Sequence, residues 1–133
     1  MITVIESFKI VGLAVDRTKP SRNRDAAAMR QMHLQLSGSP DGDWIRIFDE
    51  ERKFPRHSGW RHAWIDRNCI VIDCVPDEIE KCHLSDLKTD VENTNRKFAE
   101  LQQQRHQNQQ KKRAEQDAER AKLNELAGKL KFD

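Results

Sequence analysis

Hydrophobic and polar positions alternate in short segments of the first half of the chain, and this pattern predicts β-strands. Phe8 and Ile10 alternate with Lys9, and apolar positions continue to Val15, so residues 8–15 are expected to form a first strand. Residues 32–37 alternate in the same way and predict a second strand, antiparallel to the first. The glycine- and proline-bearing segment 37–43 (SGSPDGD) is expected to end it.

Two segments leave alternatives open. Residues 17–24 contain Pro20 and many polar side chains, so a loop is expected, followed by Asp25 and three alanines that begin a short helix or belong to a continuous strand. Residues 43–54 favour a short helix capped by Asp41 or Asp43. The alternative for this segment is a strand over 44–48.

A hairpin is the clearest local prediction. Residues 60–66 (WRHAWID) and 69–75 (CIVIDCV) are both rich in strand-forming side chains. They flank a turn around Asp66, Arg67 and Asn68, residue types that tolerate tight turns. We therefore expect two antiparallel strands joined at this point.

A long polar helix is expected after the hairpin, because Pro76 suits a first helical turn and the acidic residues near it suit the helix dipole. Its apolar positions are spaced in a nearly helical way: Ile79, Cys82, Leu87, Val91, Phe98 and Leu101. Residues 102–113 (QQQRHQNQQKKR) contain no apolar side chain, so they cannot join a core. Beyond them, several alanines and Leu123, Leu126 and Leu130 restore a thin apolar face.

These elements predict an α+β fold: a small antiparallel sheet of about four strands in the order strand, strand, helix, hairpin, followed by a long polar C-terminal α-helix. Six of the eight aromatic residues precede residue 65. We therefore expect a folded domain over residues 1–101, which includes the first part of the long helix. Residues 102–133 are expected to form a polar helical extension or a disordered tail.

Charge and apolar content exclude two classes of protein. The 133 residues carry 24 basic and 22 acidic side chains, a net charge of +2, which excludes the strongly basic balance of a histone-like binder. The longest apolar run, Cys69 to Ile72, is far shorter than the roughly 20 residues that span a bilayer. Three cysteines without an export signal favour a cytoplasmic location and free thiols.

The candidate metal and nucleophile residues have the wrong spacing. Cys69 and Cys74 leave opposite faces of a regular strand, and the chain has no C-x-x-C pair. Cys82 and His83 are neighbours, but adjacent helical side chains point about 100° apart. We therefore expect neither a metal nor another cofactor.

A nuclease motif is present in outline. Pro40-Asp41 followed by Glu51-Arg52-Lys53 resembles the PD-(D/E)xK nucleases, and this resemblance implies two carboxylates that bind a divalent ion, assisted by a lysine. In that family the two acids come from a strand and an adjoining hairpin. Here Asp41 is expected in a loop and Glu51 in a charged helix end, so surface charge is our interpretation, and a small metal-dependent nuclease ranks third among the functions.

The leading hypothesis is a non-enzymatic binding or assembly protein. A helix that extends beyond its domain gains stability by pairing with a second copy or with a partner protein. The expected contact residues form a docking stripe and a second contact near the end of the helix: Leu87, Val91, Phe98, Leu101, Leu123, Leu126 and Leu130.

The alternative hypothesis is a nucleic-acid-binding protein, because positive charges gather in two clusters, residues 17–24 and 105–113. The candidate side chains are Arg17, Lys19, Arg22, Arg24, Arg105, Lys111, Lys112 and Arg113. Tryptophans near residue 60 would add stacking on an exposed face of the sheet.

Overall fold

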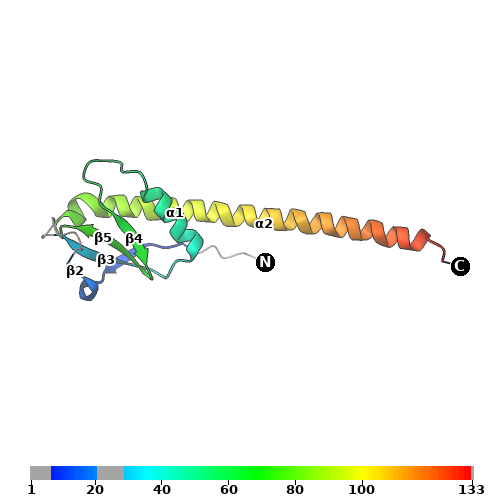
Figure 1. Cartoon of the computed structure of the whole chain (residues 1–133), viewed down its shortest axis with the longest axis horizontal. Helices are drawn as coiled ribbons and strands as arrows, with labels where there is room; N and C mark the ends of the chain where they lie inside the picture. Colours follow the sequence, from blue (N-terminus) through cyan, green and yellow to red (C-terminus); the bar gives the residue numbers. More distant parts are fainter. Residues whose placement is uncertain (1–6, 21–28, 133) are drawn as a thin grey trace. The chain divides into compact units, whose positions relative to one another are not determined.

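The computed structural model describes residues 7–20 and 29–132 of the chain, and it has the predicted α+β fold (Figure 1). The sheet is antiparallel and has five strands: β1 (Ile10–Leu13), β2 (Lys19–Pro20), β3 (Arg30–Leu36), β4 (Ala63–Asp66) and β5 (Cys69–Cys74). The strand order is β1-β3-β5-β4, and β2 also pairs with β3. β3 therefore organises the sheet, because it hydrogen-bonds to three other strands.

The expected first strand and the loop after it are both revised. β1 ends at Leu13, and a short 3-10 turn, η1 (Val15–Arg17), separates it from β2. The strand is therefore shorter than the predicted 8–15, and part of the predicted loop 17–24 is a two-residue strand against β3. The helix or strand proposed to begin at Asp25 falls on residues 21–28, which lie outside the described residues.

The predicted hairpin is confirmed, and its first strand, β4, begins at Ala63 rather than at the predicted residue 60. Asp66 of β4 pairs with Cys69 of β5, so the turn consists of Arg67 and Asn68. Arg67 has a φ of 56°, the left-handed conformation that such tight turns use.

The helical interpretation of residues 43–54 is also confirmed, as α1 (Gly42–Arg52). Asp41 is the cap: its side chain accepts a 3.0 Å hydrogen bond from the backbone N–H of Trp44. Trp44 and Phe48, four residues apart on one face of the helix, are fully buried.

The long helix begins with an irregular turn that changes its predicted stripe. A π-helical turn, η2 (Ile79–His83), precedes α2 (Leu84–Lys129). The wider turn places His83 on the buried side and leaves Cys82 exposed. The predicted position of Cys82 in the apolar stripe is therefore wrong.

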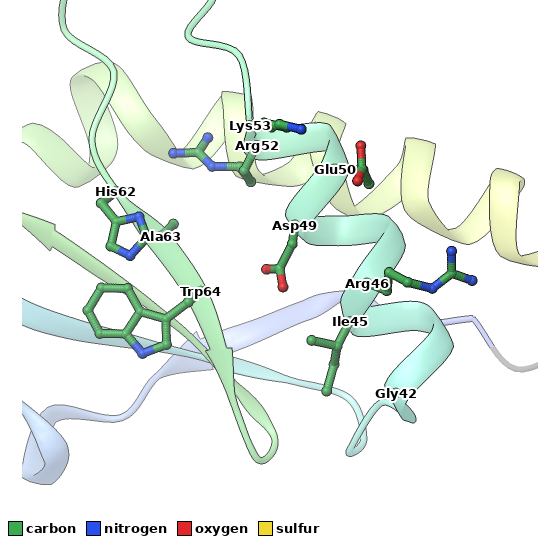
Figure 2. A pocket seen from close by; sticks show the side chains of 10 residues that line it. All are labelled: Gly42, Ile45, Arg46, Asp49, Glu50, Arg52, Lys53, His62, Ala63 and Trp64. Carbon is green, nitrogen blue, oxygen red and sulfur yellow. The ribbon is translucent and has the colours of Figure 1, made fainter.

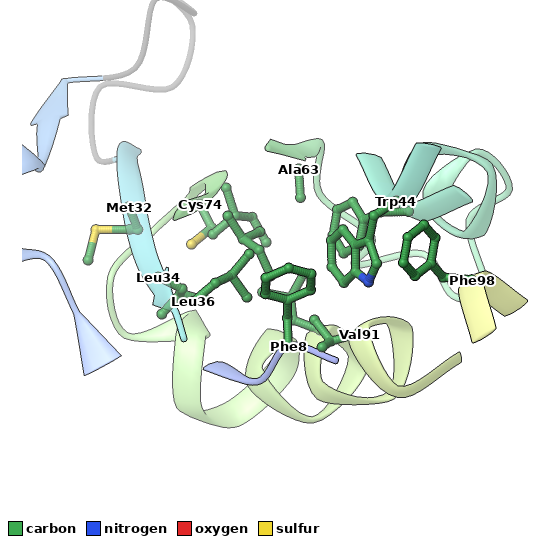
Figure 3. Close-up of a cluster of buried hydrophobic side chains, with 13 residues drawn as sticks. Phe8, Met32, Leu34, Leu36, Trp44, Ala63, Cys74, Val91 and Phe98 are labelled. Carbon is green, nitrogen blue, oxygen red and sulfur yellow. The ribbon is translucent and has the colours of Figure 1, made fainter. Parts of the chain in front are cut away.

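Buried side chains from the sheet, α1 and the start of α2 form one core (Figure 3). Trp44 contacts Phe8 edge-to-face and stacks with Phe48, at ring-centroid distances of 5.3 and 5.7 Å. Asn95 of α2 joins these elements, because its Oδ1 accepts hydrogen bonds from the Phe8 backbone and from the Trp44 indole, both at 3.0 Å. The polar atoms at this junction thus have partners inside the fold.

A buried ionic cluster fixes the loop between α1 and β4. Asp90 of α2 is completely buried and accepts hydrogen bonds from Arg52 at 2.9 Å and Arg56 at 2.6 Å. The two guanidinium groups also lie over the Trp60 ring, at 3.8 and 4.7 Å from its centroid. One carboxylate therefore holds two cations and an aromatic side chain of the loop against α2.

The chain divides into two structural units, residues 1–99 and 100–133. In the first unit, α2 contributes buried side chains at Leu87, Asp90, Val91, Thr94 and Phe98. In the second unit, residues 103–132 of the chain are exposed.

Candidate functional site

Most of the predicted docking stripe is occupied by the domain itself. Leu87, Val91 and Phe98 are only 0, 2 and 5% exposed, and all three belong to the core. These side chains are not available to a partner, and this part of the predicted contact surface is corrected. Leu101, at the end of the stripe, is half-buried.

The leucines near the end of α2 are exposed. Leu123, Leu126 and Leu130 have 57, 51 and 50% of their surface accessible. At 100° per residue, they lie within about 60° of one another around the helix. Three alanines of this unit, Ala114, Ala118 and Ala121, fall on the opposite side, so the apolar face here consists of the leucines and Ala127.

The first of the predicted basic clusters is partly neutralised. Arg17 donates hydrogen bonds to Asp66 at 3.0 Å and to Cys69 Sγ at 3.2 Å. Lys19 lines a small polar hollow of about 320 Å³ beside the buried His33. Arg22 and Arg24 lie outside the described residues. The second cluster, residues 105–113, lies on the exposed part of α2.

The nuclease-like residues occupy the two ends of one helix. Asp41 caps the start of α1, whereas Glu51 lies in its last turn and pairs with Lys97 of α2. Lys53 follows directly at the helix end. Both carboxylates thus have structural partners, and the structure does not bring them together.

The cysteines and histidines are also separated. Cys74 lies in the core, whereas Cys69 contacts Arg17 on the other face of the sheet. His83 is buried and its Nε2 lies 3.0 Å from Glu78, while its neighbour Cys82 is exposed. Within residues 7–20 and 29–132, no group of three metal-ligating side chains lies close enough to hold an ion.

A groove of about 730 Å³ runs between α1 and β4 (Figure 2). We refer to it as the α1–β4 groove. The strand side consists of three consecutive residues, His62, Ala63 and Trp64, and the helix side consists of seven residues from one face of α1 and its end: Gly42, Ile45, Arg46, Asp49, Glu50, Arg52 and Lys53.

Charged and aromatic side chains face this groove. Figure 2 shows Ile45 and Asp49 extending from α1 into the space beside β4. Partial burial raises the pKa of the Asp49 carboxyl above its ordinary value, while nearby His62 acts in the opposite direction. The His62 ring stacks on Trp64 at 4.9 Å between centroids, which gives the strand side an aromatic surface.

Sequence reasoning did not identify the α1–β4 groove. Its residues come from two segments, 42–53 and 62–64, and no motif links them. The signal that was available is the i, i+3/i+4, i+7 spacing of Arg46, Asp49 and Lys53, which places three charges on one side of the predicted helix.

Comparison with known proteins finds no family model, curated protein or solved structure that matches this chain. Among the described residues, no helix combines the length and the apolar character needed to cross a membrane.

Proposed function

We propose that this chain is a non-enzymatic binding protein that inserts the end of its C-terminal helix into an apolar groove of a partner protein. The observation that carries the proposal is the set of exposed leucines at positions 123, 126 and 130. Together with Ala127 they follow the i, i+3, i+4, i+7 spacing with which amphipathic helices enter such grooves.

Charge indicates the chemistry of the partner. Residues 120–132 contain four basic side chains, Arg120, Lys122, Lys129 and Lys131, and one acidic side chain, Glu125. Glu125 already pairs with Lys129 at 3.3 Å. A groove with an acidic rim complements this segment, and a basic rim would repel it.

A second copy of the chain is a poorer partner. Half-burying three leucines contributes about 1 kcal/mol each, so two copies together gain about 6 kcal/mol. Association costs about 4–15 kcal/mol before any net affinity appears. Two copies of the basic segment would also bring like charges together, whereas a preformed acidic groove supplies extra apolar area and the opposite charge.

The proposal is tested by site-specific photo-crosslinking. A photoreactive amino acid at position 127, between Leu126 and Leu130, is expected to crosslink one partner with an acid-rimmed groove, and a probe at Ala118 on the opposite side of the helix is not. Leu126→Gln with Leu130→Gln should abolish the crosslink, because it removes two anchors. Ala114→Gln with Ala118→Gln, the matched control, should retain it.

Light scattering of the purified chain completes the test. We expect a monomer. A stable dimer that dissociates in the Leu126→Gln, Leu130→Gln variant would overturn the proposed partner in favour of self-association. Crosslinks of equal strength from positions 118 and 127 would show that the leucines do not form the contact.

The nucleic-acid alternative has weaker support. Arg17 is bound by Asp66 and Cys69, and the exposed cluster at 105–113 contains no aromatic side chain on which a base would stack. No observation on the described residues favours it over protein binding.

A further inference from the structure

The free edge of the sheet adjoins the α1–β4 groove. β4 pairs with β5 on one side only, and within the described part of the chain no strand lies on its other side. An unpaired edge presents backbone donors and acceptors to any extended chain that approaches it. The groove thus has a row of hydrogen-bonding groups along one wall.

The hairpin determines which backbone groups are free. Because the turn has two residues, Asp66 and Cys69 form a hydrogen-bonded pair, and the pattern alternates from there along the strands. The bond from the Asp73 backbone N–H to His62 O, 3.1 Å, fits this alternation. Ala63 and Ile65 therefore direct their N–H and C=O groups away from β5, toward the open edge.

The helical wall carries charges of both signs. Five charged side chains of α1 line the groove: Arg46, Asp49, Glu50, Arg52 and Lys53. Arg52 is paired with Asp90, and Glu50 lies about 100° around the helix from Asp49. The other three lie within about 60° of one another, in the order positive, negative, positive. Along the helix axis Arg46, Asp49 and Lys53 span about 10.5 Å, and three alternate residues of a strand span about 13 Å. When the two central positions are aligned, the outer positions differ by about 2 Å at the Arg46 end and by less than about 1 Å at the Lys53 end. An extended segment lying on β4 would place every second side chain opposite one of these charges.

We propose that the α1–β4 groove binds an extended peptide segment, which adds to the sheet as a strand beside β4 and carries a basic side chain flanked two positions away on each side by acidic ones. The central basic side chain meets Asp49. The acidic side chains meet Arg46 and Lys53, and the intervening side chains lie on the side of Trp64. The surface is separate from the C-terminal leucines and does not depend on the function proposed for them.

The dimensions of the groove suit such a segment. α1 has 11 residues, about 16 Å of helix, and five extended residues span about 17 Å. Asp49 remains exposed, so that an incoming side chain reaches it. Displacing water around a partly desolvated carboxylate strengthens an ion pair formed there.

The test uses labelled synthetic peptides and the full chain, with binding measured by fluorescence anisotropy. The peptide Thr-Glu-Val-Lys-Val-Glu-Thr is expected to bind, and the charge-reversed Thr-Lys-Val-Glu-Val-Lys-Thr is expected to bind at least tenfold more weakly. N-methylation of the backbone nitrogens that face β4 should also weaken binding at least tenfold, because it blocks strand pairing without changing charge.

A charge swap in the protein makes the assignment specific. Asp49→Lys should weaken binding of the first peptide and improve binding of a version with glutamate at the centre. Glu92→Lys, the same change at an exposed position of α2 outside the groove, should alter neither. Circular dichroism checks that both variants are folded.

Three outcomes would overturn the proposal. They are equal affinity for the charge-reversed peptide, insensitivity to backbone methylation, and no binding of any peptide by the folded wild-type chain. Binding of adenosine or guanosine monophosphate that is lost in Trp64→Ala, with no peptide bound, would assign the groove to nucleotides instead.

Discussion

The two parts of α2 show how differently one helix is stabilised along its length. Residues 84–99 place five side chains in the interior of the domain, including the completely buried Asp90. Residues 103–129 are exposed, and their helix depends on good helix formers such as Gln, Lys, Glu and Ala. The first part is therefore held by tertiary packing and the second by local propensity.

The largest contrast is expected from truncating one apolar side chain in each part. Phe98→Ala should lower the free energy of unfolding by about 3–5 kcal/mol, because it leaves a cavity in the core. Leu126→Ala should change it by less than about 0.5 kcal/mol. Urea unfolding followed by tryptophan fluorescence measures both, and equal losses would show that Leu126 has a tertiary contact within the chain.

A charge substitution sharpens the comparison further. Asp90→Asn should cost about 3 kcal/mol, because Arg52 loses the negative charge that balances it in the interior. Asp117→Asn, on the exposed part of the same helix, should change stability by less than about 0.5 kcal/mol. Both are measured by the same unfolding experiment. An Asp90→Asn variant as stable as the wild type would mean that the buried charge is not needed.

A smaller effect is expected where the helix begins. Hydrogen bonds from Arg61 and then from His83 hold the pKa of Glu78 below its ordinary value of 4.5. A lowered pKa means that the ionised form stabilises the fold above about pH 5, and that this contribution is lost as the pH falls through the lowered pKa. Glu78→Gln should cost less than about 1 kcal/mol at pH 7.

That difference between wild type and Glu78→Gln should shrink as the pH falls from about 5 to 3. Unfolding curves at several pH values measure it. A difference that stays constant over this interval would show that Glu78 acts through its shape rather than its charge.

The smallest effect is expected from removing the exposed part altogether. A chain ending after Leu101 should lose much of its helical circular dichroism per molecule. Its tryptophan-monitored unfolding should remain within about 0.5 kcal/mol of the full chain, because none of the removed side chains belongs to the core. A larger loss would show that the two parts of α2 are energetically coupled.

Local patterns in the sequence predicted the hairpin and favoured α1 over a strand at residues 44–48. Strand-forming side chains and turn residues predict β4 and β5, and Asp41 or Asp43 ahead of Trp44 and Phe48 favours a capped helix. The two-residue strand β2 was missed because a pairing so short leaves no periodic signal.

The buried face of α2 was predicted less well, because polar residues occupy part of it. The gap between Val91 and Phe98 in the apolar stripe is filled by buried Thr94, whose hydroxyl donates to the Asp90 carbonyl at 2.6 Å. Asp90 lies beside Val91 on the same face. Only the distant arginines Arg52 and Arg56 make its burial favourable, and no local pattern identifies such partners.

The ionic cluster around Asp90 also limits how this sequence can change over evolutionary time. Losing the carboxylate alone leaves two cations without a counter-charge, and losing Arg52 alone leaves a buried anion with one partner. A chain that has lost only one of these residues is less stable than a chain with the complete cluster or with apolar residues at all three positions. Positions 52, 56 and 90 should therefore be inherited as a set, and a descendant that abandons one of them should abandon all three.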